Sequence, residues 1–178
     1  MNDKRIKQLK LIAMTALFAA LTAVATAFIK INTGINEGYL HFGDSVIYLA
    51  ACILPLPYAC LAAAVGGGIA DLLAGAAVWA PITAIIKALN VLPFAVMYSA
   101  KITKSPNKIV NKATVAMPVL SGLITIFGYL LAEGFMYSFP SAWTSVPFSI
   151  VQATGSAVVY WILGASLDKL NFKNRLFK

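Results

Sequence analysis

Three ionisable side chains, Asp71, Lys87 and Glu133, interrupt long apolar stretches of this sequence. A charged group inside a lipid bilayer is costly to desolvate, so its presence there indicates a functional or pairing role. Asp71 lies eight residues before Trp79, and Lys87 lies eight residues after it. If Trp79 marks the turn of a helical hairpin, the two side chains reach a similar depth, about 12 Å from the turn. We expect them to form an ion pair that either locks the hairpin or contacts a ligand.

Glu133 stands near the end of an apolar block, with Tyr137 one turn further. A carboxylate can accept two N–H bonds from the edge of an amidine-like or guanine-like ring. Aromatic faces beside a few polar groups suit a small, flat heterocycle. For Trp79 and Trp143 the alternative is the ordinary aromatic belt of a membrane protein. The polar and aromatic residues expected near one membrane surface are Asp71, Trp79, Lys87, Asn90, Glu133, Tyr137, Trp143 and Gln152.

The stretch GYLHFGDSVIYL, residues 38–49, holds the only histidine of the chain directly before an apolar run. Asp44 and Ser45 are predicted to cap the following helix, because either side chain can accept from its unpaired N–H groups. Tyr39 and His41 lie further out, and we expect them to belong to a lid over a ligand site.

The elements that must position these residues are membrane helices. Of the 178 residues, 60% are hydrophobic and 11% are charged, whereas soluble domains carry about 25% charged residues. The apolar residues form blocks of about the length of a bilayer crossing. The sequence therefore predicts an all-α integral membrane protein, with residues 1–178 as a single domain. The expected helices are 9–29, a short 45–54, 58–78, 81–100, 114–136 and 146–167.

Basic residues set the predicted topology. They gather before the first block, in the gap 101–113 and in the C-terminal tail, as the positive-inside rule describes for cytoplasmic segments. An even number of crossings must then separate the N-terminus from the central gap, so 45–54 counts as a crossing. The result is six transmembrane helices with both termini cytoplasmic, and with the loop 30–44 outside.

Composition also argues against several classes of function. The net charge of +8 is explained by topology, so nucleic acid is not an expected partner. The sequence has no G-x-x-x-x-G-K-[ST] phosphate loop, no H-E-x-x-H motif and one histidine, so we expect no ATPase, no enzyme, no cofactor and no metal site. Cys52 and Cys60 lie in apolar surroundings and are expected to be small core residues.

The segments TALFAALTAVATAFIKI, GYLHFGDSVIYLAACILPLPYACLAAAVGGGIADLLAG and WAPITAIIKALN resemble the substrate-binding S components of energy-coupling factor (ECF) vitamin transporters. The subgroup they resemble holds hydroxymethylpyrimidine, riboflavin-like and queuosine-precursor carriers. The resemblance covers the whole chain and is strongest over residues 11–92. It implies six helices, and a ligand site at the outer side capped by the loop 30–44. It also implies a prokaryotic cell-membrane location.

The resemblance further implies partners: a membrane scaffold subunit and two ATPase subunits, with toppling of the loaded S component in the bilayer. Alanines four apart on the first helix would dock on the scaffold, either Ala16 with Ala20 or Ala19 with Ala23. Such spacing lets helices approach closely, although alanine is simply abundant here. The alternative function is a self-sufficient ion-coupled secondary transporter or channel.

Overall fold

The computed structural model describes residues 3–36, 38–99 and 107–176, so part of the basic gap, 101–106, lies outside the described residues. Helices dominate it, and the long ones follow the predicted apolar blocks. The elements in chain order are α1 (Asp3–Ala27), β1 (Lys30–Asn32), β2 (Tyr39–His41), α2 (Gly43–Ile53), α3 (Leu56–Ala74), α4 (Ala80–Leu89), α5 (Leu92–Ser99), the 3₁₀-helix η1 (Thr114–Ala116), α6 (Met117–Met136), α7 (Phe139–Lys169) and α8 (Phe172–Leu176).

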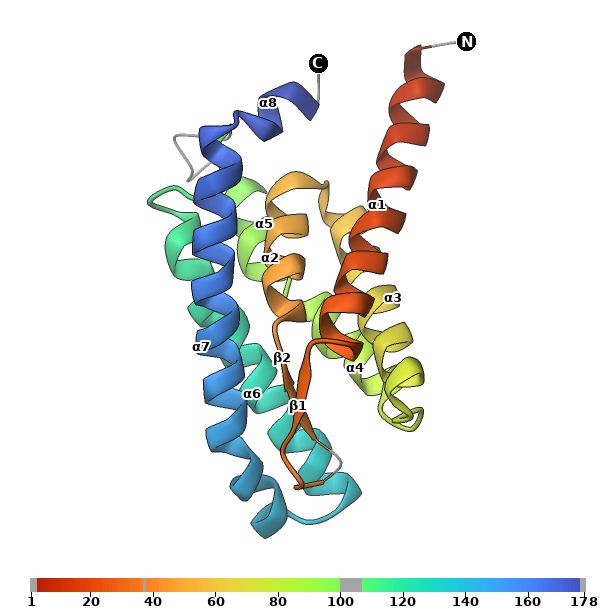
Figure 1. The fold of residues 1–178 in the computed structure, drawn as a ribbon, viewed down its shortest axis with the longest axis vertical. Helices are drawn as coiled ribbons and strands as arrows, with labels where there is room; N and C mark the ends of the chain where they lie inside the picture. Colours follow the sequence, from red (N-terminus) through yellow and green to blue (C-terminus); the bar gives the residue numbers. More distant parts are fainter. Residues whose placement is uncertain (1–2, 37, 100–106, 177–178) are drawn as a thin grey trace.

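Among the described residues, five stretches are long and apolar enough to cross a membrane, and α2 is a shorter apolar helix. The long stretches are Lys4–Ala27, Leu56–Ala74, Ala80–Met97, Thr114–Met136 and Phe139–Lys169. The start of α1 and the short helix α8 lie at one end of the molecule, and the β1–β2 hairpin lies at the other (Figure 1). The predicted fold class, an all-α membrane protein with a short second helix, is confirmed.

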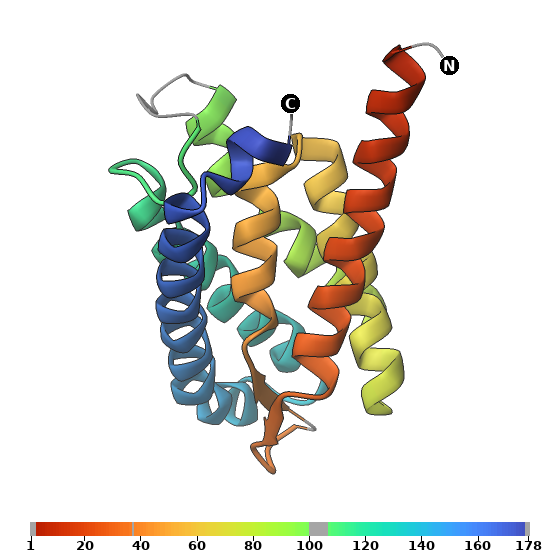
Figure 2. The same cartoon turned by 45° about the horizontal axis from the view of Figure 1, so that its top comes forward.

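Helix α2 occupies the centre of the bundle. It packs against α1, α3, α5 and α7, and the two views place it between the long helices (Figure 2). Its 11 residues span about 16 Å, much less than a bilayer core. Nearly all of them are buried. A helix that is surrounded by protein needs no polar face, so α2 can be apolar on every side.

Helices α1 and α3 cross at close range because Gly66 has no side chain. A Cβ atom at Gly66 would lie 2.6 Å from the backbone oxygen of Ala19, which is too short for any other residue. Ala19 and Ala23 are buried within the protein, whereas Ala16 and Ala20 are exposed. The expectation that Ala19 and Ala23 form the docking face is therefore wrong, because packing inside the fold already uses them.

The predicted helix 81–100 is divided into α4 and α5. Pro93 has no N–H to donate to the carbonyl of Leu89, one turn earlier, which removes a helical hydrogen bond at this point. The backbone oxygen of Asn90 at this break accepts a 2.7 Å hydrogen bond from Ser121 Oγ of α6. A side chain thus satisfies a polar backbone group that lipid could not.

Helix α7 begins at Phe139, seven residues before the predicted start at 146, and runs for 31 residues. Ser138 Oγ accepts from the N–H of Ser141, and Pro140 lies in the first turn, where proline needs no donor. A helix of this length, about 46 Å, extends beyond the bilayer core. Trp143 therefore lies within α7, although it precedes the predicted start of this helix.

Candidate functional site

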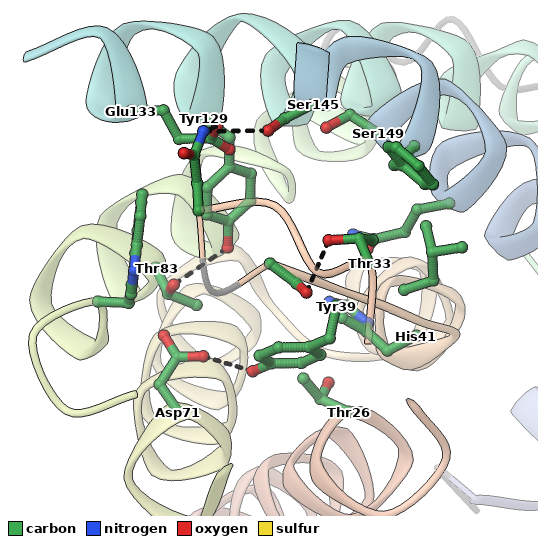
Figure 3. Close-up of a pocket in the computed structure, with 16 residues that line it drawn as sticks. Thr26, Thr33, Tyr39, His41, Asp71, Thr83, Tyr129, Glu133, Ser145 and Ser149 are labelled. Atoms are coloured by element: carbon green, nitrogen blue, oxygen red, sulfur yellow. Dashed lines mark hydrogen bonds between the residues drawn. The ribbon is translucent and has the colours of Figure 1, made fainter. Parts of the chain in front are cut away.

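A cavity lies between the β1–β2 hairpin and the ends of the helices beneath it. The hairpin pairs antiparallel, with Asn32 opposite Tyr39 and Lys30 opposite His41. The cavity contains about 660 Å³ of space between protein atoms, its mouth included. The lining residues are Thr26, Thr33, Asn36, Gly38, Tyr39, Leu40, His41, Asp71, Trp79, Thr83, Tyr129, Glu133, Ser145, Phe148, Ser149 and Gln152 (Figure 3).

The lining combines aromatic faces with hydrogen-bonding groups. Trp79 and Tyr129 lie side by side, with ring centroids 6.1 Å apart. The Tyr129 hydroxyl lies 3.0 Å from Thr83 Oγ1. Flat ligands stack on such rings, and the surrounding polar atoms fix their orientation.

Asp71 enters the cavity from α3, and the hairpin covers it. The Tyr39 hydroxyl donates a 2.5 Å hydrogen bond to Asp71 Oδ1, as Figure 3 shows. Burial and this bond together raise the pKa of Tyr39 well above its ordinary value, so the hydroxyl remains a donor. Asp71 Oδ2 is buried and has no hydrogen-bond partner among the described residues.

Glu133 enters from α6 and holds the tip of the hairpin. Asn36 Nδ2 donates to Glu133 Oε2 at 2.6 Å and to Ser145 Oγ at 3.3 Å. Ser141 Oγ donates to Asn36 Oδ1 at 2.7 Å. We call these three hydrogen bonds the Asn36 latch; they join the hairpin to α6 and α7.

Lys87 does not pair with Asp71, so the expected ion pair is wrong. Lys87 Nζ lies 2.6 Å from Asp44 Oδ1, and both side chains are almost fully buried. The depth estimate failed because the turn is asymmetric: Asp71 lies three residues before the end of α3, while Lys87 lies seven after the start of α4. The side chain of Lys87 instead lies beside Gly67, one turn deeper in α3 than Asp71. A Cβ atom added at Gly67 would lie 2.9 Å from Lys87 Cγ.

The pairing also overturns the predicted capping role of Asp44. Phe42 is the N-cap residue of α2 and makes no side-chain capping bond. Asp44 Oδ2 accepts from Gln152 Nε2 at 3.2 Å, and Ser45 Oγ donates to the backbone oxygen of Phe42. Gln152, a lining residue, is therefore held in place by the buried Asp44–Lys87 pair.

His41 closes the inner side of the hairpin and is buried. Its Nδ1 accepts from the backbone N–H of Gly43 at 3.1 Å, which requires an unprotonated Nδ1. Burial, with a further contribution from the Lys87 ammonium, lowers the pKa of His41 to about 3. The imidazole is neutral at physiological pH.

The structure brings six of the ten predicted ligand residues to the cavity: Tyr39, His41, Asp71, Trp79, Glu133 and Gln152. The other four lie elsewhere. Lys87 and Asn90 are buried below the cavity, and Asn90 Nδ2 donates to Thr125 Oγ1. Tyr137 packs beside Trp79 and is half exposed, and Trp143 is 62% exposed.

Several lining residues were not predicted, and some left a signal. Ser145, Ser149 and Gln152 follow one another at spacings of four and three, which places them on one face of α7. The signal was hidden because the helix was expected to begin at 146. Tyr129 similarly lies one turn before Glu133 on α6. Asn36 gave no sequence signal, because its contacts depend on how the hairpin folds back.

The described residues contain no group of three or more His, Cys, Asp or Glu side chains that could hold a metal ion. The cavity therefore offers aromatic faces, hydroxyls, amides and carboxylates as its recognition chemistry.

This chain is similar to a known protein family and to a relative in an archaeon. The family described as "ECF-type riboflavin transporter, S component" matches residues 6–169, nearly the whole chain. An uncharacterised protein of Pyrococcus woesei, described as lying in a "gap 3'region", is 29% identical over 146 residues, which cover 82% of this chain and 93% of that protein. The chain thus belongs to the family of ECF-type riboflavin transporter S components, the substrate-binding subunits of energy-coupling factor importers in the cell membrane.

Proposed function

We propose that this S component captures a small, flat nitrogen heterocycle in the cavity beneath the β1–β2 hairpin. The cavity supports this proposal, because rings from Trp79, Tyr129 and Phe148 share it with the buried carboxylate of Glu133. A carboxylate accepts N–H donors from the edge of a ring whose face stacks on an aromatic side chain.

Among flat heterocycles, a 7-deazaguanine such as a queuosine precursor fits this chemistry well. Its ring N–H and adjacent amino group form an edge that one carboxylate can accept in two hydrogen bonds. Hydroxymethylpyrimidine, pyridoxine and riboflavin are the competing ligands, each with a flat ring but with a different arrangement of donors. Glu133 is the residue proposed to distinguish them.

The hairpin is proposed to act as the lid of this site. Tyr39 and Asn36 reach from it to Asp71 and Glu133, so the hairpin holds itself over the cavity. Opening requires these hydrogen bonds to break, and a bound ligand would replace them.

Delivery into the cell is proposed to need a scaffold subunit and two ATPase subunits, with toppling of the loaded protein in the membrane. Exposed Ala16 and Ala20 on α1 offer a surface on which a scaffold helix could approach closely. The sequence itself carries no phosphate-binding loop of the Walker type, which supports energy coupling through other subunits.

The experiment is uptake of radiolabelled 7-deazaguanine, hydroxymethylpyrimidine, pyridoxine and riboflavin into proteoliposomes. The protein is reconstituted alone, with scaffold and ATPase subunits, and with ATPase subunits unable to hydrolyse ATP. We expect uptake only with the active complete complex, and co-purification of the subunits. Uptake by the protein alone, driven by an ion gradient, would instead establish the secondary-transporter alternative.

The site itself is tested by native mass spectrometry of the purified protein for a co-bound molecule. Glu133→Gln keeps the shape of the side chain and removes its charge, so it should weaken binding of that molecule. Unchanged affinity would show that Glu133 does not contact it.

A further inference from the structure

Two carboxylates enter the same cavity from different helices, Asp71 from α3 and Glu133 from α6. Figure 3 shows them on either side of the hydrogen-bonded Thr83 and Tyr129 side chains. Both carboxylates are more than nine-tenths buried. A ligand in the cavity therefore meets an acceptor of N–H bonds at two places.

Neither carboxylate is neutralised by a cation in the described part of the chain. The nearby Lys87 is bound to Asp44, and His41 is neutral. Lys30 Nζ lies over the aromatic ring of Tyr39, 4.9 Å from the ring centroid. Among the described residues, Lys30 makes no ion pair with either carboxylate. The cavity thus carries an excess of negative charge in surroundings of low dielectric constant.

The two carboxylates differ in how the closed hairpin satisfies them. Glu133 receives the Asn36 amide. Asp71 receives only the Tyr39 hydroxyl, on Oδ1, and its Oδ2 is left without a donor among the described residues. A buried acceptor without a donor is unfavourable by about 1–3 kcal/mol, and by more when it is charged. Asp71 is one of the residues that line the cavity, so the unsatisfied oxygen belongs to a side chain that borders the space where a ligand would lie.

We infer that Asp71 is a specificity-determining residue, whose free oxygen accepts an N–H group of a ligand that presents a second donor to Glu133. The ligand class is an amino-substituted or protonated nitrogen heterocycle with donors on two edges. Phosphorylated or otherwise anionic relatives are rejected, because their charge would face two buried carboxylates. This inference rests on the proposed function and specifies its substrate class.

The test uses the purified full-length protein in detergent and two matched pairs of probes. One pair is 7-deazaguanine and the same compound methylated on the nitrogen of its five-membered ring, which blocks the N–H donor on the edge opposite the amino group. The other is 4-amino-5-hydroxymethyl-2-methylpyrimidine and the same ring with hydrogen in place of the amino group. Flavin mononucleotide serves as the anionic probe. Affinities are measured by calorimetry for the natural protein, Asp71→Asn and a control.

We expect the first compound of at least one pair to bind at least tenfold more tightly than the second, and flavin mononucleotide not to bind. Asp71→Asn replaces an acceptor with a donor of the same shape, so the tenfold preference should disappear. The matched control is Asp168→Asn at the opposite end of the molecule, where the carboxylate accepts from the N–H groups of Ile109 and Val110. This control should keep the preference.

A second readout does not need a ligand. Removing the unsatisfied charge should raise the thermal midpoint of ligand-free Asp71→Asn. Asp168→Asn keeps one oxygen and so loses one of its two accepted N–H bonds, and it should melt lower. Failure of every amino compound to bind, or a preference that Asp71→Asn leaves intact, would overturn the inference. Uptake by the complete complex would stand in either case, so a failure here is distinct from a failure of the proposed function.

Discussion

Removing the Asn36 side chain should release the hairpin from the cavity. Asn36 has a backbone φ of 48°, a left-handed conformation that glycine adopts freely. Asn36→Gly therefore deletes the three hydrogen bonds of the Asn36 latch without forcing the backbone. Asn36→Ala deletes the same bonds and adds about 1–2 kcal/mol of backbone strain.

The magnitude follows from the three bonds. The bond to the Glu133 carboxylate, 2.6 Å long, contributes about 1.5–3 kcal/mol, and each of the two neutral bonds about 0.5–1.5 kcal/mol. Since the tip is only partly buried and water replaces the lost partners, we expect the lower half of the sum, about 2.5–4 kcal/mol. At a factor of ten for each 1.4 kcal/mol, the open fraction rises about 60- to 700-fold.

The assay uses His41, the only histidine of the chain, which is buried under the closed hairpin. Diethylpyrocarbonate modifies a neutral imidazole when it becomes accessible, and mass spectrometry of the hairpin peptide measures the rate at pH 7. The rate in Asn36→Gly should exceed that of the natural protein by the factor above. Ser141→Ala removes one neutral bond and should raise the rate only about 2- to 12-fold. Equal rates in all three proteins would refute the latch.

The Asp44–Lys87 pair, the buried His41 and the close crossing of α1 and α3 stabilise the fold that carries the site. Asp44→Asn or Lys87→Met alone leaves a buried charge unpaired and should lower the free energy of unfolding by about 3–5 kcal/mol, while the double variant should lose less than the sum, as a thermal-melt cycle in detergent would show. The pKa of His41 falls from its ordinary 6.5 to about 3 on folding, so the unfolded chain binds more protons than the folded protein between these values. The free energy of unfolding should therefore drop as the pH falls through this window, by up to about 1.4 kcal/mol per pH unit. The thermal midpoint of His41→Asn should depend less steeply on pH. Gly66→Ala should destabilise by about 1–3 kcal/mol because its Cβ meets backbone, whereas Gly68→Ala, whose nearest contact is 3.5 Å, should melt at an unchanged or higher temperature.

Apolar length and charge placement predicted most of the fold. The helices followed the apolar blocks because a backbone in lipid must satisfy its hydrogen bonds within its own segment. Pro93 indicates where the predicted helix 81–100 divides, because proline has no N–H to donate to the carbonyl of Leu89. The early start of α7 was marked by Ser138 and Pro140, but these signals are local and the apolar block that follows them is the stronger one.

The candidate site was predicted in part. Buried carboxylates are rare enough in membrane helices that Asp71 and Glu133 stood out by residue type alone, and both line the cavity. Their partners did not stand out. Asp71 bonds with Tyr39, 32 positions away, and Glu133 with Asn36, 97 positions away. The sequence predicts a capping role for Asp44, because neighbouring residues in the chain can indicate only a local role.

The sequence by itself determined that this chain crosses a membrane in a bundle of helices, with its costly polar groups gathered toward one surface. Those features depend on the transfer of each segment into lipid, which is set by composition over about 20 residues. Only the tertiary structure decided which polar group meets which. Lys87 of α4 pairs with Asp44. Tyr39 of the hairpin donates a hydrogen bond to one oxygen of Asp71, and the other oxygen has no donor among the described residues. Which side chains pair inside the bilayer depends on how each helix is rotated and how deep each residue lies. A connecting loop that is longer or shorter by a few residues can shift that depth by a full helical turn, so the spacing of residues along the sequence does not determine the pairs.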